Sequence, residues 1–277
     1  MPATTVAYAY TPPQPLLPER PGAASGSVSR LPTRCSSCSS RGVCLPCGLT
    51  GKDADRVEEL IYTRRRIRGG ETLYYAGDAF VSLYAVRSGS FKTNLTLEDG
   101  RDQVTGFCMA GEMIGMEGIG SGQHTCDAIA LEDSNVCVIP YARLENLSRE
   151  LVGLQRQLHQ LMSQEIVRQS GLMLLLGTMR AEQRVAALLL NLSQRFSARG
   201  YSASEFNVRM TRAEMGSYLG LKLETVSRVL SRFQDEGLIV VQQKNVQIKD
   251  LVALRRVVGR CGISSAGSRS GPNLPRH

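Results

Sequence analysis

The sequence predicts an α+β protein: a glycine-rich antiparallel β barrel or jelly roll, then a long helix, then a C-terminal helix-turn-helix with a β hairpin behind it. Three observations carry this prediction. From about Gly70 to Pro140, short runs of β-branched, aromatic and other apolar residues are separated by glycines, as in antiparallel strands joined by turns. After Pro140 the apolar residues recur every three or four positions, which is typical of a helix face. Near the C-terminus, two amphipathic stretches flank Gly220, as in a helix-turn-helix.

The composition is that of a globular protein with room for two domains of ordinary size. The chain has 277 residues, of which 42% are hydrophobic and 21% are charged, and both fractions are usual for such proteins. The longest purely apolar run, Val185–Leu190, is far shorter than the roughly 20 residues that a transmembrane helix needs. The N-terminus lacks the basic start and apolar core of a secretory signal. We therefore expect a cytoplasmic protein with no membrane partner.

Changes in composition divide the chain into five segments. The first of them is rich in Pro, Gly, Ala and Ser and too poor in apolar residues to fold, so we expect it to be a disordered leader. The predicted segments are residues 1–34 (disordered leader), 35–141 (cysteine segment and β domain), 142–178 (long helix), 179–258 (helix-turn-helix domain) and 259–277 (disordered tail).

Four cysteines crowd into the stretch CSSCSSRGVCLPC, at Cys35, Cys38, Cys44 and Cys47. In a reducing compartment, such thiols more often bind metal or take part in redox chemistry than form disulfides. Spacing alone leaves several arrangements open: disulfides, a zinc site built from two Cys-x2-Cys pairs, an iron–sulfur cluster, or three cluster ligands plus one bystander. The protein would accordingly be a structural module, a redox enzyme or a sensor.

The long helix has two apolar faces. A helix needs only one such face to pack on its own domain, so the second predicts a partner, most simply the same helix of a second copy in a homodimer. A helix buried between two domains is the alternative. One face carries Leu154, Leu158 and Leu161, and the other is a heptad-like seam of Met162, Ile166, Gln169 and Met173, spaced by 4, 3 and 4 residues.

The C-terminal pattern is a helix-turn-helix with a wing. Thr211 and Glu214 have the spacing of a capping box at a helix start, and Gly220 ends that helix. A second helix runs from about Lys222 to Glu236, and two β-branched runs around a QKN turn follow it. The side chains that this second helix is expected to bury are Val226, Val229, Leu230 and Phe233.

The exposed face of this second helix carries hydrogen-bonding side chains close to the helix start. Glu224, Ser227 and Arg228 lie at positions i, i+3 and i+4 and therefore share one face. Arginine can bridge O6 and N7 of guanine, and a carboxylate can accept from N4 of cytosine. Between Gly177 and Arg260 the chain has 14 basic and 7 acidic residues, an excess that favours a polyanion partner. We predict double-stranded DNA as the partner, with a solvated charged face as the alternative.

The chain from Cys35 to about Asp250 resembles the CRP/FNR superfamily of bacterial transcription regulators, and specifically the oxygen-responsive FNR type. The residues that carry the resemblance are SLYAVRSGSFK, QVTGF, AGEMIG, IGSG, LMSQEI, MLLL, RVAALLLNLSQRF and YLGLKLETVSRVLSRF. The resemblance implies a cyclic-nucleotide-binding-like β roll as sensor domain, a long dimerisation helix and a C-terminal winged helix-turn-helix. It also implies a DNA-binding regulator of the anaerobic response rather than an enzyme.

The FNR resemblance further implies an oxygen-labile 4Fe–4S cluster, one per monomer. Its thiolate ligands would be Cys35, Cys38 and Cys44, which have the family's spacing, and Cys137 in the β roll. In this family the intact cluster favours the dimer, and oxygen converts the cluster to a 2Fe–2S form and then destroys it, so that DNA is released. The recognition triad of Glu, Ser and Arg falls on Glu224, Ser227 and Arg228, which implies a two-fold site with TTGAT-type half-sites. The loop Thr96–Arg101 corresponds to loops that contact RNA polymerase, although an ordinary solvated turn is an equal alternative.

Three features test or qualify the resemblance. Where cyclic-AMP-binding members have an Arg-Ser pair, this chain has Gln123, His124, Thr125 and Cys126, so we expect no cyclic nucleotide. Cys47 is an extra thiol, which keeps a zinc-stapled regulator open as an alternative. Gln169 stands where an acidic residue is expected on the dimer seam, and its neutrality predicts a more dimeric cluster-free form. A redox enzyme is less favoured, since the chain has only three histidines and no dinucleotide or phosphate-loop fingerprint.

Overall fold

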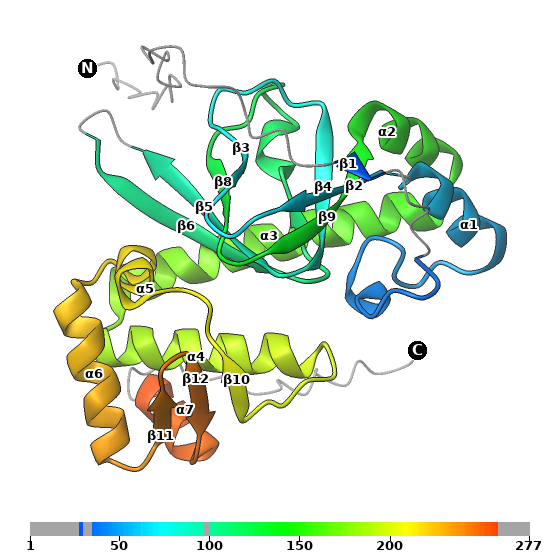
Figure 1. Ribbon diagram of the computed structural model, residues 1–277. Helices are drawn as coiled ribbons and strands as arrows, with labels where there is room; N and C mark the ends of the chain where they lie inside the picture. Colours follow the sequence, from blue (N-terminus) through cyan, green and yellow to red (C-terminus); the bar gives the residue numbers. More distant parts are fainter. Residues whose placement is uncertain (1–27, 30–34, 62, 97–99, 260–277) are drawn as a thin grey trace, which may run out of the picture.

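The computed structural model describes residues 28–29, 35–61, 63–96 and 100–259. A β domain flanked by helices lies at one end of the molecule and a mainly helical domain at the other (Figure 1). The helix α3 (Val152–Thr178) runs between them, and its 27 residues span about 40 Å. The predicted disordered leader and tail lie outside the described residues, except for Val28–Ser29 and Gly259.

The β domain is the roll that the glycine-separated runs predict. Its two sheets have the strand orders β1-β2-β9-β4-β7 and β3-β8-β5-β6, and every pairing is antiparallel. A core that includes Tyr74, Tyr84, Phe91 and Val136 fills the space between them. The strands are β1 (Val28–Ser29), β2 (Thr63–Ile67), β3 (Thr72–Tyr74), β4 (Ser82–Ser88), β5 (Ser90–Thr96), β6 (Asp102–Met109), β7 (Met113–Ile114), β8 (Asp127–Ala130) and β9 (Ser134–Pro140).

Alternation along β4 and β9 gives this sheet a second buried face. Tyr84 and Val136 point into the roll, whereas Ala85, Cys137 and Ile139 join a different core on the outside of the sheet. Successive side chains of a strand point to opposite faces, so the odd-numbered residues of both strands face outward together.

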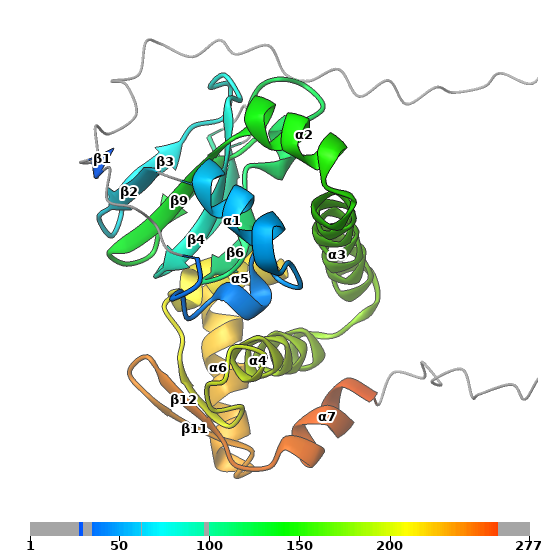
Figure 2. The same ribbon diagram turned by 90° about the vertical axis from the view of Figure 1, so that its right-hand side faces the viewer.

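The outer core packs the cysteine segment against the start of α3. Leu45 of that segment, Leu144 of α2 (Tyr141–Glu150) and Leu154 of α3 are all fully buried in it. Figure 2 shows the segment and α1 (Gly51–Leu60) beside the roll and α3. The predicted helical region 142–178 contains two helices, separated at Leu151, whose backbone is extended. The elements here are the short 3-10 turn η1 (Arg41–Val43), α1 (Gly51–Leu60) and α2 (Tyr141–Glu150); a second such turn, η2 (Met116–Gly118), lies in the roll.

The C-terminal domain is a winged helix-turn-helix. The predicted capping box is present: Glu214 N–H donates to Thr211 Oγ1 at 3.1 Å, and Thr211 N–H donates to Glu214 Oε2 at 2.7 Å. Gly220 adopts a φ of 61°, a left-handed conformation that favours glycine, and the chain turns there. The four predicted core residues of the second helix are all buried. The elements are α4 (Ala181–Ser197), β10 (Glu205–Asn207), α5 (Arg212–Leu219), α6 (Leu223–Asp235), β11 (Ile239–Gln242), β12 (Asn245–Ile248) and α7 (Leu251–Gly259).

Candidate metal centre and nucleic-acid interface

Four thiols from two distant parts of the chain lie together on the outer face of the roll. Cys137 lies in the middle of β9, and the ladder places it opposite Ala85 of β4 and Arg64 of β2. Cys35 is buried in the same core, and Cys44 packs against that core. Cys38 influences the titration of the other three thiols. The structure therefore brings Cys35, Cys38, Cys44 and Cys137 close to one another.

Burial and mutual proximity raise the pKa values of Cys35, Cys44 and Cys137 in the metal-free chain. Burial raises the pKa of Cys35 to about 11, and the neighbouring Cys137 thiol adds to the shift. Burial likewise raises the pKa of Cys44 to about 12, against a backbone hydrogen bond, and Cys137 and Cys35 raise it further. Only a bound cation or cluster can hold several thiolates side by side at neutral pH, and its binding would release their protons.

Cys47 stands apart from this group. Its thiol donates a hydrogen bond to the carbonyl oxygen of Gly42 at 3.0 Å. It does not figure among the groups that shift the pKa of Cys35, Cys44 or Cys137. In this arrangement the Cys47 thiol is bonded to a backbone carbonyl of its own segment.

The spread of the four thiols bears on which metal group they suit. In the part of the chain that the structure describes, no three His, Cys, Asp or Glu side chains converge closely enough to hold one metal ion. A tetrahedral zinc ion would draw four sulfurs to within about 3.8 Å of one another. The ligands of a 4Fe–4S cluster bind separate irons and lie farther apart, and all of them are thiolates. Four neighbouring thiols are the donor set that both a four-cysteine zinc site and a 4Fe–4S cluster use.

The predicted dimer seam lies along α3. Met162, Ile166 and Met173 are exposed apolar side chains, so the single chain leaves this face uncovered. Gln169 is half-buried, and its side-chain amide donates to Glu165 Oε1 at 2.7 Å. The neighbouring stripe of Leu154, Leu158 and Leu161 packs on the outer core, as expected for the face that belongs to the chain's own fold.

The predicted recognition residues lie on the outer face of α6. Glu224 and Arg228 are exposed and Ser227 is half-buried. Among the described residues, none of these three side chains makes a hydrogen bond or an ion pair. Their donors and acceptors therefore have no partner within the described chain, and the same domain carries exposed basic residues. These basic residues are Arg212 at the start of α5, Lys222 just before α6 and Lys244 in the wing turn.

The C-terminal domain docks on the roll through polar contacts as well as a shared core. Lys92 Nζ of β5 binds Glu214 Oε1 at 2.8 Å, so the carboxylate that caps α5 also holds the roll. Ser217 Oγ of α5 accepts from Val104 N–H at 2.8 Å, and the rings of Phe107 and Tyr218 meet edge to face.

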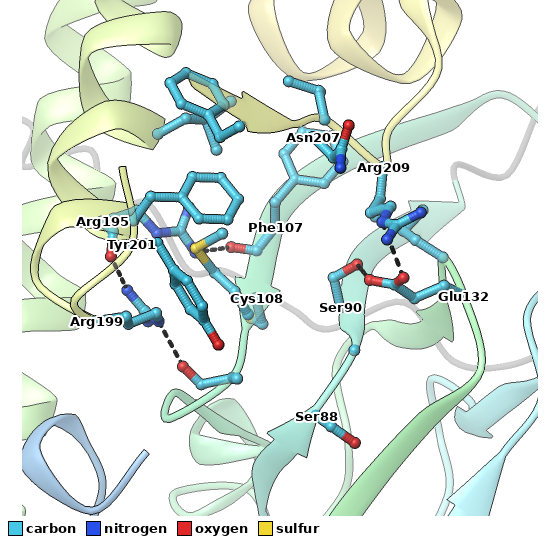
Figure 3. A pocket seen from close by; sticks show the side chains of 18 of the residues that line it. Ser88, Ser90, Phe107, Cys108, Glu132, Arg195, Arg199, Tyr201, Asn207 and Arg209 are labelled. Atoms are coloured by element: carbon cyan, nitrogen blue, oxygen red, sulfur yellow. Dashed lines mark hydrogen bonds and ion pairs between the residues drawn. The ribbon is translucent and has the colours of Figure 1, made fainter. Parts of the chain in front are cut away.

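A cavity of about 450 Å³ lies beside this contact (Figure 3). On one side Arg195 and Arg199 bind the carboxylate of Glu112, at 3.0 and 2.6 Å. On the other side Arg209 pairs with Glu132 at 2.9 Å. The cavity is lined by both domains, and its wall also includes Ser39 of the cysteine segment and Arg87 of β4.

Sequence reasoning missed the charged residues around the thiols. Glu58 of α1 accepts from Ser36 N–H at 3.3 Å and raises the pKa of Cys35, whereas Arg87 lowers it. Arg87 lies in the stretch SLYAVRSG, where an arginine that follows an apolar run is the sole hint of a special role. No local pattern indicates that this arginine lies beside a cysteine fifty residues away.

Two protein families match the chain: a cyclic nucleotide-binding domain over residues 64–150 and a Crp-like helix-turn-helix domain over residues 183–257. The transcriptional regulatory protein Btr of Bordetella pertussis is 46% identical over 226 residues, 82% of this chain and 93% of that protein. The fumarate and nitrate reduction regulatory protein of Escherichia coli K12 is 43% identical, over 81% of this chain and 90% of that protein. Among solved structures, FixK2 from Bradyrhizobium japonicum is similar with a TM-score of 0.65 and 29% identity, over 70% of this chain and 96% of that chain.

Proposed function

Because the chain belongs to the CRP/FNR family of transcription regulators and is of the FNR type, we propose that it senses oxygen through a 4Fe–4S cluster, one per chain. It is a DNA-binding regulator and not an enzyme. The proposed ligands are Cys35, Cys38, Cys44 and Cys137. The observation that carries the proposal is the gathering of these four thiols, from two distant segments, on the outer face of the roll.

The chain's own residues supply the ligands and the coupling of the proposed sensor. When bound, the cluster supplies a centre that reacts with oxygen and is lost. Cys35 and Cys137 belong to the same apolar core as Leu154 of α3, so the ligand segment and the dimerisation helix share their packing. Leu49 lies so close to Gly153 of α3 that a Cβ there would be 3.0 Å from the leucine Cδ2. A change in the ligand segment therefore acts directly on the start of α3.

Dimerisation and DNA binding are the proposed output. Met162, Ile166, Gln169 and Met173 meet the same residues of a second copy, and the homodimer presents two copies of α6 to a two-fold DNA site. Glu224, Ser227 and Arg228 read TTGAT-type half-sites in the major groove. A monomer keeps about half of the phosphate contacts, so a modest loss of dimer becomes a large loss of DNA occupancy.

The remaining parts of the proposal concern other partners. Within the roll, the rings of Tyr74 and His124 stack with centroids 3.6 Å apart, and Nδ1 of the histidine lies 2.9 Å from Oε1 of the Glu117 carboxylate. This packing and the missing Arg-Ser pair support a roll that binds no cyclic nucleotide. No helix of the described residues is long and apolar enough to cross a bilayer, and the proposed site of action is the cytoplasm. RNA polymerase is the further proposed partner, although the centre of the proposed contact loop, residues 97–99, lies outside the described residues.

The experiment that tests the proposal is purification without air, followed by assays of iron, acid-labile sulfide and DNA binding before and after exposure to oxygen. We expect four irons per chain, visible absorbance typical of iron–sulfur clusters, and joint loss of both the absorbance and DNA binding on aeration. Stoichiometric zinc without iron would contradict the proposal and favour the zinc-stapled alternative.

Two variants distinguish the proposed cluster ligands, which include Cys137, from the alternative zinc site, which includes Cys47. Cys137→Ala removes a thiol that only the cluster arrangement uses, so iron should be lost while the protein still folds. Cys47→Ser is the matched control, because the Cys47 thiol contacts Gly42 instead of the other thiols, and it should keep its iron. A Cys137→Ala protein with undiminished metal would refute the proposed ligand set.

A further inference from the structure

Arg87 of β4 occupies an irregular point of the ladder beside the thiol group. Ala85 pairs with Cys137 of β9, and the register then shifts by a bulge between Val86 and Ser88. The bulge leaves Arg87 without a partner residue of its own on β9, and bulges commonly redirect a side chain toward a functional site. The guanidinium of Arg87 lies near the thiols of both Cys35 and Cys137.

The guanidinium of Arg87 has a donor with nothing to donate to. Its Nη1 atom is shielded from solvent and has no hydrogen-bond partner among the described residues. An unpaired buried donor is costly, and the cost is larger for a charged group. The natural acceptor at this place is an anionic sulfur, because the charge-assisted N–H···S contact would satisfy both the donor and the charge.

Two opposite charges flank this side of the thiol group. The Arg87 guanidinium makes a side-chain hydrogen bond to the Cys137 thiol, and both this bond and its positive charge favour the thiolate. Glu58, which accepts from Ser36 N–H at 3.3 Å, acts on Cys35 in the opposite direction. Thus Arg87 favours, and Glu58 disfavours, negative charge on the sulfurs.

We infer that Arg87 is a positioning residue for the proposed cluster: its guanidinium donates a hydrogen bond to a metal-bound sulfur on the Cys35–Cys137 side and offsets the negative charge of the thiolates. This inference rests on the proposed function. Hydrogen bonds to the sulfurs and nearby charges set the reduction potential of iron–sulfur clusters, and outer partners of metal ligands commonly affect metal retention by at least tenfold. Arg87 therefore slows the loss of the cluster to oxygen.

Arg87→Gln and Arg87→Lys, both prepared without air, test this role. In Arg87→Gln we expect the cluster absorbance to decay about tenfold faster in air. We also expect reduction of the cluster to become about tenfold less favourable, a shift of ~59 mV to more negative potential for a one-electron couple. Arg87→Lys keeps the positive charge and a hydrogen-bond donor, so its lifetime in air and its reduction potential should lie close to those of the wild type. Iron and sulfide contents of the freshly purified proteins verify that each variant is loaded.

Two further variants exclude a general effect of charge or packing. Glu58→Gln keeps an acceptor for Ser36 N–H and removes the negative charge, so it should shift the potential in the opposite direction. Arg66→Gln removes an equal charge from an exposed arginine of β2, which is paired with Asp133 at 3.2 Å, and should leave the potential unchanged.

The outcomes distinguish this inference from the proposed function. An Arg87→Gln protein with wild-type potential and wild-type lifetime in air would overturn the role of Arg87 and leave the cluster proposal intact. Equal losses in Arg87→Gln and Arg87→Lys, together with lowered thermal stability, would overturn it in favour of a packing role. A wild-type protein without iron would overturn the proposed function and this inference together.

Discussion

The two halves of α3 treat their apolar side chains differently. In the first half, Leu154 is fully buried and Leu158 and Leu161 pack on the core that holds Cys35 and Cys137. In the second half, Ile166 and Met173 are each 66% exposed. The first half is thus part of the chain's own fold, whereas the second half presents apolar surface that a single chain leaves uncovered.

The contrast shows how one helix can connect the thiol site, the proposed dimer surface and the DNA-binding domain. Beyond its exposed half, α3 ends at the helix-turn-helix, where Arg184 donates to the carbonyl oxygens of Leu176 at 2.8 Å and Leu219 at 2.9 Å. One guanidinium therefore ties the end of α3 to the end of α5. In the proposed mechanism, a displacement that begins at the buried half reaches both the proposed dimer surface and the DNA-binding domain through this helix and the Arg184 contacts.

The largest effect is expected from a charge on the exposed half. Ile166→Glu places like charges opposite each other in the homodimer, and since Ile166 is exposed, the monomer fold should not change. We expect a monomer at micromolar concentration and about 1,000-fold weaker binding to a two-fold DNA site, because half of the specific contacts are lost. Without air, sedimentation measures the oligomeric state and fluorescence anisotropy measures the affinity for DNA. Gln164→Glu, on the opposite side of the helix, is the control, and a dimeric Ile166→Glu protein would refute the exposed half as the interface.

The buried half should respond in stability instead. Leu154→Ala removes a fully buried side chain, and we expect the free energy of unfolding to fall by about 3 kcal/mol. Urea denaturation of the metal-free protein measures this change in the free energy of unfolding. Val152→Ala, at an exposed position two residues earlier, should change stability by less than about 0.5 kcal/mol. Equal losses of unfolding free energy in the two variants would show that burial of Leu154 does not stabilise the fold.

The sequence predicted best what local chemistry determines. The capping box of Thr211 and Glu214, the left-handed Gly220 and the buried face of α6 all depend on residues within one or two turns. The helix α1, the break at Leu151, the strand β10 and the helix α7 were not predicted, because each is stabilised by packing on elements distant in sequence. For example, Gln183 of α4 donates to the carbonyl oxygens of Val257 and Val258 in α7.

The candidate site shows the same division between local and distant determinants. The three thiols at Cys35, Cys38 and Cys44 are evident as a spacing. Cys137 entered the ligand set only through the family resemblance, because nothing local relates it to the others. The ladder between β4 and β9, which fixes which face Cys137 occupies, also determines that Arg87 lies beside it. Register of this kind is a property of the folded sheet and leaves no trace in a short window of sequence.

A smaller effect is expected at the polar position of the exposed seam. Gln169→Glu would place two like charges near the dimer axis. The new carboxylate would also repel Glu165, which in the wild type accepts a hydrogen bond from the Gln169 amide at 2.7 Å. We expect dimerisation of the metal-free protein to weaken about tenfold, or about 1.4 kcal/mol. Sedimentation equilibrium over a concentration series measures the dissociation constant. If the wild-type metal-free protein is already a clean monomer at micromolar concentration, Gln169 does not favour the dimer.

The smallest effect concerns the junction of the halves, where Arg168 lies 3.6 Å from the Glu112 carboxylate. Burial raises the pKa of Glu112, but Arg195, Arg199 and Arg168 lower it more, so the net pKa lies below its ordinary value of 4.5. A carboxyl whose pKa is lower in the folded state stabilises the fold above its unfolded-state pKa and loses that contribution as pH falls through the folded value. The wild type should therefore lose stability below about pH 4.5.

Glu112→Gln tests this contribution, because the amide keeps an acceptor for the arginines but cannot titrate. Its unfolding free energy should fall less steeply on the acid side, by at most about one bound proton per chain. Urea titrations between neutral and acid pH measure the slope, and Glu59→Gln, at an exposed carboxylate of α1, serves as control. Identical slopes in wild type and Glu112→Gln would show that the junction carries no charge coupling. The link between the two halves would then consist of apolar packing alone, and signals from the thiol site would have to pass through Leu154 and its neighbours.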